Sequence, residues 1–138
     1  MIVITIAVDF DGTLFREDSE GSLHPVPGAV EAMEELSRRN YRVVIHSCRT
    51  GIASEQGRLA NEIQFIDRAL RKFHIPFDET YTGPKMVADL YVDDRAIPFT
   101  GNWEQTTIEI QSRSESLIQS IEVGQEGHCT RLRPRKRS

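Results

Sequence analysis

Residues 2–13 read IVITIAVDFDGT, and this stretch decides the fold. A run of β-branched and apolar residues continues to Val8 without the spacing of three and four that marks a helical stripe. Such a run is typical of a strand buried on both faces, as in the centre of a parallel sheet. The sequence therefore predicts a first strand over residues 2–8, with the acidic stretch DFDGT at its carboxyl end.

Predicted helices and strands alternate downstream of this strand. Pro27 and Gly28 open a helix that stops near Asn40, and residues 43–47 (VVIHS) form a second buried strand. Residues 54–73 then carry the clearest helical stripe of the chain. The members of the stripe are Leu59, Ile63, Ile66, Leu70 and Phe73.

Two short strands are predicted next, near residues 79–82 and at 89–93. Residues 103–121 carry apolar side chains at roughly helical spacing and predict a last helix, although Ile108 and Ile110 also alternate as in a strand. Strands that alternate with helices favour right-handed crossovers and a parallel sheet. We therefore expect a Rossmann-like α/β fold, arranged as a three-layer sandwich with a central parallel sheet.

The composition fits one globular domain, predicted over residues 1–121, with a basic tail at 122–138. The chain has 138 residues, about the size of one core. Residues 131–138 hold five of the 17 basic residues, which leaves 12 basic against 21 acidic residues elsewhere. An acidic body speaks against a nucleic-acid-binding surface.

The length of the apolar runs and the number of cysteines predict where the protein is located. No apolar run approaches the ~18 residues that a membrane span needs. The two cysteines, Cys48 and Cys129, match neither a disulfide framework nor a zinc spacing. We therefore expect a cytoplasmic protein that does not insert into a membrane.

Polar side chains follow three of the predicted strands. Asp9 and Asp11 follow the first, Ser47 ends the second, and Asp93 with Asp94 ends the strand at 89–93. The carboxyl ends of parallel strands share one edge of the sheet, where ligands bind. Carboxylates gathered there repel one another unless a cation lies among them, and hard oxygen ligands favour Mg²⁺.

A lysine completes the set, because Lys85 precedes the strand at 89–93 and can fold back to the same edge. A lysine and a hydroxyl beside a cation can receive a phosphoryl group, whose transfer depends mainly on charge stabilisation. These pieces occur in a fixed order between residues 2 and 103. In that order, DFDGT, Ser47, Lys85 and the aspartate pair at 93–94 resemble the four motifs of the haloacid dehalogenase-like (HAD) superfamily.

The resemblance implies a role for each matched residue. Asp9 would be the nucleophile that forms an aspartyl-phosphate, and Asp11 would protonate the leaving oxygen and then activate water. Ser47 would bind the transferring phosphoryl group, and Lys85 would neutralise its charge and orient Asp9. Asp11 also points to phosphate ester hydrolysis, because dehalogenases of the superfamily lack an aspartate at this position and the P-type pumps carry threonine.

The resemblance also implies a Mg²⁺ site and a phosphate-binding turn. The metal would bind Asp9, the backbone carbonyl of Asp11 and Asp93, with Asp94 assisting. Gly12 would allow a sharp turn that aims backbone N–H groups at the phosphate.

Arg49 follows the second motif, in HSCRT. It is predicted either to reach a second anionic group of the substrate or to lie in solvent as a loop arginine.

The gaps between motifs are too short for the cap domains of larger HAD members. About fourteen residues separate Thr13 from the helix near Gly28, enough for a flap only. A capless site is predicted either to be covered by a second subunit in a homo-oligomer or to accept bulky substrates. Leu14, Phe15 and Leu23 in the flap support the oligomer, because they are otherwise predicted to be exposed.

The sequence thus predicts a Mg²⁺-dependent phosphomonoesterase that acts on a phosphorylated small molecule. Specificity in the family resides in caps and flaps, so the reaction class is predicted but not the substrate. Two alternatives stay open: a non-catalytic HAD-like module that binds phosphate or a partner, and a phosphatase of polynucleotide ends.

Overall fold

The computed structural model describes residues 2–84 and 86–123, which divide into two compact units with a boundary between Asp94 and Arg95. The first unit holds six strands and three helices, and the second holds one helix. That last helix ends at Glu122.

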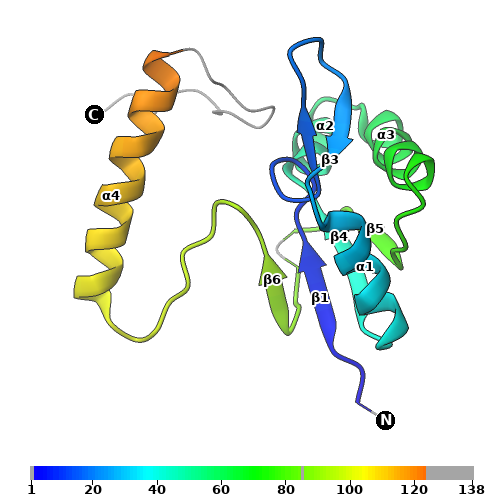
Figure 1. Ribbon diagram of the computed structural model, residues 1–138, viewed down its shortest axis with the longest axis horizontal. Coiled ribbons are helices and arrows are strands. Elements are labelled where there is room, and N and C mark those ends of the chain that lie inside the picture. The colour runs from blue at the N-terminus through cyan, green and yellow to red at the C-terminus, as the bar shows by residue number, and fades with distance from the viewer. Residues whose placement is uncertain (1, 85, 124–138) are drawn as a thin grey trace. The chain divides into compact units, whose positions relative to one another are not determined.

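The first unit is built on a four-stranded parallel sheet (Figure 1). Its strands are β1 (Thr5–Val8), β4 (Arg42–His46), β5 (Glu79–Tyr81) and β6 (Leu90–Val92), in the order β5-β4-β1-β6. The register places Val8 beside Ile45 and Val92, so β1, β4 and β6 end at about the same level. The predicted α/β, Rossmann-like arrangement with a parallel sheet is confirmed.

The first strand is shorter than the sequence predicts. Ile2 and Val3 are 88% and 52% exposed, and β1 begins only at Thr5. The reason is the partner strand, because β4 begins at Arg42, opposite Thr5. A strand over residues 2–8 is therefore wrong in its first three residues.

One face of the sheet is covered by helices α1 (Ala29–Arg38) and α3 (Leu59–Lys72). Met33 from α1 and Ile66 and Leu70 from α3 join one buried cluster with the alternate side chains of β1 and β4. These strand side chains are Ile6, Val8, Val43 and Ile45. Such clusters supply most of the stability of a small domain, at about 25 cal/mol for each Å² of apolar surface buried.

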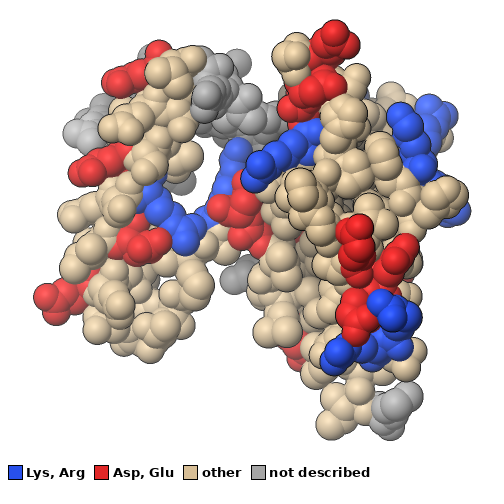
Figure 2. All heavy atoms as spheres, in the orientation of Figure 1, with Lys and Arg blue, Asp and Glu red and all other residues tan. Residues whose placement is uncertain are grey.

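The opposite face of the sheet shows Ala7 and Val44, which pack against Met86, Tyr81 and Ala88. The described part of the first unit thus contains the sheet and one helical layer, and the third layer of the sandwich stays a prediction. On the outer surface of α1, acidic and basic side chains lie side by side (Figure 2). Glu35 pairs there with Arg38 and Arg39, so the charges of this helix compensate one another.

A short helix, α2 (Cys48–Glu55), lies where the sequence predicts a loop and the start of the longer helix. Gly57, with φ of 70°, follows α2, and α3 begins only at Leu59. The single helix predicted over residues 54–73 is therefore wrong at residues 56–58, where the chain leaves α2 before α3 begins. Two of the three buried residues of α2, Arg49 and Thr50, are polar, so the helix has no apolar stripe that a sequence pattern could detect.

The flap is an antiparallel hairpin of β2 (Phe15–Glu17) and β3 (Leu23–Pro25), which lies beyond the carboxyl end of β1 (Figure 1). Leu14 and Phe15 are buried, and Leu23 is half-buried. The Phe15 ring lies 4.7 Å from that of Phe10 and 5.7 Å from that of Phe73. The predicted exposure of these flap residues is wrong, because they fill the core, and they provide no argument for a subunit contact.

The second unit contains α4 (Trp103–Glu122), which confirms the predicted last helix. Asn102 caps it by accepting a hydrogen bond from the Gln105 N–H at 3.0 Å. Within the described residues, none of the helices is long and apolar enough to cross a membrane. The basic tail at 131–138 lies outside the described residues.

Candidate active site

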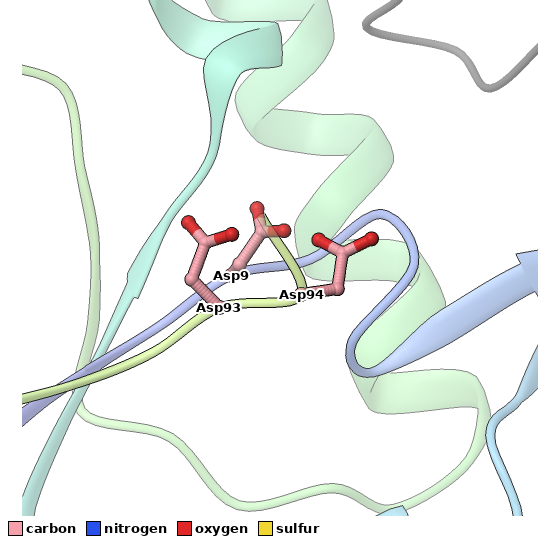
Figure 3. A group of neighbouring side chains, drawn as sticks. All are labelled: Asp9, Asp93 and Asp94. Atoms are coloured by element: carbon pink, nitrogen blue, oxygen red, sulfur yellow. The ribbon is translucent and has the colours of Figure 1, made fainter. Parts of the chain in front are cut away.

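Three carboxylates meet at the carboxyl edge of the sheet. Asp9 follows β1, and Asp93 and Asp94 follow the neighbouring strand β6. One oxygen of each side chain lies within 4.8 Å of the others, and Figure 3 shows the three carboxylates directed into a shared space. The structure thus brings together three of the residues that the sequence singles out as metal ligands.

The crowding of these carboxylates changes the acidity of Asp9. Burial, followed by the charge of Asp93 and a hydrogen bond with Asp94, raises the pKa of Asp9 from 3.8 to about 7. The Phe10 backbone N–H opposes this shift. Without a neighbouring cation, the ionised form of Asp9 is therefore disfavoured up to neutral pH.

The donor set fits a hard divalent cation such as Mg²⁺. All three side chains offer carboxylate oxygens, the ligand type that Mg²⁺ prefers, at about 2.1 Å. Two oxygens at that distance on opposite sides of an ion are about 4.2 Å apart. The three oxygens lie within 4.8 Å of one another, a separation comparable with this distance, so the group can hold an ion.

Thr13 links the two acidic segments, a role that the sequence analysis missed. Its hydroxyl donates to Asp9 Oδ2 at 3.3 Å and accepts from the Asp94 N–H at 3.2 Å. The signal was available, because Thr13 is the last residue of the DFDGT motif.

Gly12 is required by both its conformation and its surroundings. Its φ of 80° lies in the left-handed region, and a Cβ atom would lie 2.3 Å from Asp94 Oδ2. The Gly12 N–H donates to the Phe15 carbonyl at 2.8 Å, within the turn that enters the hairpin. A hydrogen bond from this N–H to a phosphate would therefore have to replace an existing one.

Ser47 is buried at the carboxyl end of β4 and caps α2. Its Oγ accepts from the Arg49 N–H at 3.2 Å, which uses an oxygen lone pair and not the hydroxyl hydrogen. The capped position is thus compatible with donation to a ligand. Lys85, the remaining predicted catalytic residue, lies outside the described residues.

Asp11 is directed away from the acidic group and toward Arg49. Arg49 Nε donates to Asp11 Oδ2 at 2.7 Å, and Nη2 donates to Oδ1 at 2.8 Å. The Arg49 side chain is only 4% exposed, so the prediction of a loop arginine in solvent is wrong. An anionic group of a substrate would have to compete with Asp11 for this guanidinium.

Comparison with known proteins adds little to this geometry. No protein-family model and no curated protein matches the chain. Among solved structures, the chain is similar to a conserved protein of Bacteroides thetaiotaomicron, with 26% identity and a TM-score of 0.49. The match covers 81% of this chain and 93% of that one. Fold and site thus define a Rossmann-like α/β protein with an acidic group that can hold a metal ion.

Proposed function

We propose that this chain is a Mg²⁺-dependent phosphomonoesterase of the HAD type. The observation that carries the proposal is the convergence of Asp9, Asp93 and Asp94 at the sheet edge, within 4.8 Å of one another. The first of them begins the DFDGT stretch, and Asp11 lies two residues further on. Three carboxylates in one place favour a bound cation. The Asp11 carboxylate, which is held by Arg49, would carry out the proton transfer.

The cation would be held by the carboxylates of Asp9, Asp93 and Asp94, with the Asp11 backbone carbonyl as a further oxygen ligand. When bound, it supplies positive charge that offsets the repulsion among these carboxylates and the charge of a phosphoryl group. It would also favour the ionised form of Asp9, which is the form that can act as a nucleophile.

The reaction would then proceed in two steps on the protein's own residues. In the first, a carboxylate oxygen of Asp9 bonds to phosphorus while the ester oxygen leaves and takes a proton from Asp11. In the second, water attacks phosphorus, its proton passes to Asp11, and the Asp9–phosphorus bond breaks to release phosphate. Ser47 would donate its hydroxyl hydrogen to a phosphoryl oxygen, and Lys85 would neutralise phosphoryl charge.

The site would belong to a minimal, capless form of the superfamily. The segment from Gly12 to α1 is a hairpin with strands of three residues, and Ser47 leads directly into α2 and α3. A hairpin of this size can cover one rim of the site. A bulky phosphate ester or a second subunit would supply the rest of the cover.

A phosphate-release assay on a panel of phosphomonoesters tests the proposal. We expect turnover that is lost in EDTA, restored by Mg²⁺ and poorly supported by Ca²⁺, because the larger ion has looser coordination. The panel includes a phosphorylated oligonucleotide, so preference for it would favour a polynucleotide-end phosphatase. Full activity in EDTA would refute the metal dependence. Binding of inorganic phosphate without turnover of any ester would favour a non-catalytic module.

A further inference from the structure

Arg49 occupies a buried position that the proposed reaction does not yet use. It lies in the first turn of α2, and its side chain is 4% exposed. Its guanidinium lies 4.6 Å from the centre of the Phe65 ring and 5.7 Å from that of Phe10. Burying a guanidinium lowers the stability of the fold unless its N–H groups find acceptors. The partners of Arg49 therefore indicate the role of this residue.

The best satisfied partner of Arg49 is the Asp11 carboxylate. Two parallel hydrogen bonds, of 2.7 and 2.8 Å, join the guanidinium to both carboxylate oxygens. Such a paired arrangement fixes the plane of the carboxylate as well as its distance, which a single hydrogen bond or a lysine cannot do. Asp11 is therefore held in one orientation by a group that itself lies against two aromatic rings.

Glu62 lies on the other side of the same guanidinium. Its Oε2 is 3.6 Å from Arg49 Nη1 and is buried, and it has no hydrogen-bond donor among the described residues. A buried carboxylate oxygen in this state is stabilised chiefly by the nearby positive charge. Glu62 thus stabilises the guanidinium on the side that does not contact Asp11. Glu17 in the hairpin lies 3.9 Å from Nη2 and adds a weaker ion pair.

We propose that Arg49, supported by Glu62, is a positioning residue that orients Asp11 for hydrolysis of the aspartyl-phosphate. The inference rests on the proposed function and adds a residue to it. In this hydrolysis, water forms a bond to phosphorus, the bond from phosphorus to Asp9 breaks, and its electron pair returns to the Asp9 carboxylate. The water proton passes to Asp11, and inorganic phosphate leaves.

The hydrogen bonds between Arg49 and Asp11 suit the start of this half of the reaction. Both oxygens of Asp11 accept hydrogen bonds from Arg49, as the two oxygens of a carboxylate can. A carboxylate takes a proton from the attacking water, whereas a carboxylic acid gives one to a leaving group. The observed pairing therefore matches the water-activating role of Asp11.

Steady-state kinetics with p-nitrophenyl phosphate separates hydrolysis of the aspartyl-phosphate from its formation. Its leaving group needs little protonation, so kcat/KM reports formation of the phosphoenzyme, whereas kcat includes its hydrolysis. In Arg49→Met, kcat and KM should fall together by roughly tenfold to a hundredfold, because acid–base catalysis contributes about 10²–10⁴. Acid-quenched protein should carry one phosphoryl group by intact-mass spectrometry, at a higher occupancy than in the wild type.

Three further variants keep the test independent of folding. Arg49→Lys retains the charge without the paired hydrogen bonds, and Glu62→Gln removes the support behind Arg49. Both should show the same joint fall in kcat and KM, to a smaller extent. Arg58 approaches the same glutamate from the solvent side, at 3.6 Å, so Arg58→Met is the matched control and should behave as the wild type.

The outcomes separate this inference from the proposed function. A raised KM with unchanged kcat in the Arg49 variants would assign Arg49 to substrate binding and overturn the positioning role. So would unchanged kinetics in Arg49→Lys and Glu62→Gln, or a fall in kcat at constant KM with no trapped phosphoenzyme. A wild-type protein without Mg²⁺-dependent turnover would instead refute the phosphatase itself.

Discussion

The acidic group predicts that the stability of the metal-free protein falls as the pH rises from 5 to 8, and that Mg²⁺ reverses the fall. Asp9 has a pKa of about 7 in the folded protein against an ordinary value of 3.8. Between these values the folded protein keeps a proton that the unfolded chain has released. Its stabilising effect is complete below 3.8 and is lost as the pH rises through about 7.

The size of this loss of stability follows from the raised pKa of Asp9. Moving a pKa from 3.8 to about 7 corresponds to at most about 4 kcal/mol, since one pH unit is worth about 1.4 kcal/mol. Asp9 is partly exposed, and its acidic neighbours Asp93 and Asp94 are exposed, so screening by water reduces the difference to about 1–2 kcal/mol. For a chain of this size that is a change in Tm of roughly 3–8 °C.

Mg²⁺ should therefore stabilise the protein more at pH 8 than at pH 5. At pH 8 it meets ionised carboxylates, whereas at pH 5 it must displace a proton from Asp9. The assay is thermal unfolding of EDTA-stripped protein at both pH values, with and without millimolar MgCl2, against NaCl of equal ionic strength. This readout requires no substrate.

Two variants test whether Asp9 causes the pH dependence and the response to Mg²⁺. Asp9→Asn lacks the titrating carboxylate, so both the pH dependence and the response to Mg²⁺ should shrink. Asp67→Asn, which removes an acid that pairs with Arg71 on α3, should respond as the wild type. If Mg²⁺ raises the Tm equally at both pH values, or if Asp9→Asn responds like the wild type, the acidic group is not the cation site.

Three further predictions concern the proposed reaction and its scaffold. Asp9→Asn should keep the circular dichroism spectrum but lower kcat more than about a hundredfold, a barrier increase of about 2.7 kcal/mol, and smaller losses would rule out covalent catalysis by Asp9. Gly12→Ala should lower the free energy of unfolding by about 1–3 kcal/mol through backbone strain and the 2.3 Å approach to Asp94, measured by urea denaturation. Gly21→Ala is its control, because Gly21 has φ of 81° and nothing within 4 Å of a Cβ, so an equal loss there would remove the role of the clash. Deleting residues 129–138 should leave kcat/KM for a small phosphomonoester within about twofold, because no predicted site residue lies there, and a tenfold fall would assign the tail to the site.

The elements that the sequence predicts well are those with a strong apolar pattern. The parallel sheet follows from strands at 5–8 and 42–46 that are buried on both faces, and α3 follows from a stripe that places Ile66 and Leu70 in the core. The helix α2 has no such pattern, because its buried side chains include Arg49 and Thr50. Its available signals were local ones, a serine cap at Ser47 and a stop at Gly57.

The candidate site divides in the same way. Asp9, Asp93 and Asp94 could be predicted to meet because neighbouring parallel strands end at one edge, so topology alone places them together. The pairing of Asp11 with Arg49 could not be predicted, since it joins residues 38 apart through α2, a short helix that no apolar pattern revealed. The burial of Leu14 and Phe15 could not be predicted either, because it depends on how the hairpin folds back onto the core.

The four aspartates at this edge are compensated in two different ways, and the difference bears on their roles. Asp11 receives a fixed cation from the chain itself, because Arg49 is enclosed by Phe10, Phe65 and Glu62 and cannot be replaced from solvent. The other three share a space that includes two exposed side chains, so an ion from solvent can reach them and leave again. A metal ion can therefore control the charge at Asp9 while the Asp11 side chain keeps its pairing with Arg49. Such independent control is what a reaction needs when one carboxylate attacks phosphorus and its neighbour moves a proton.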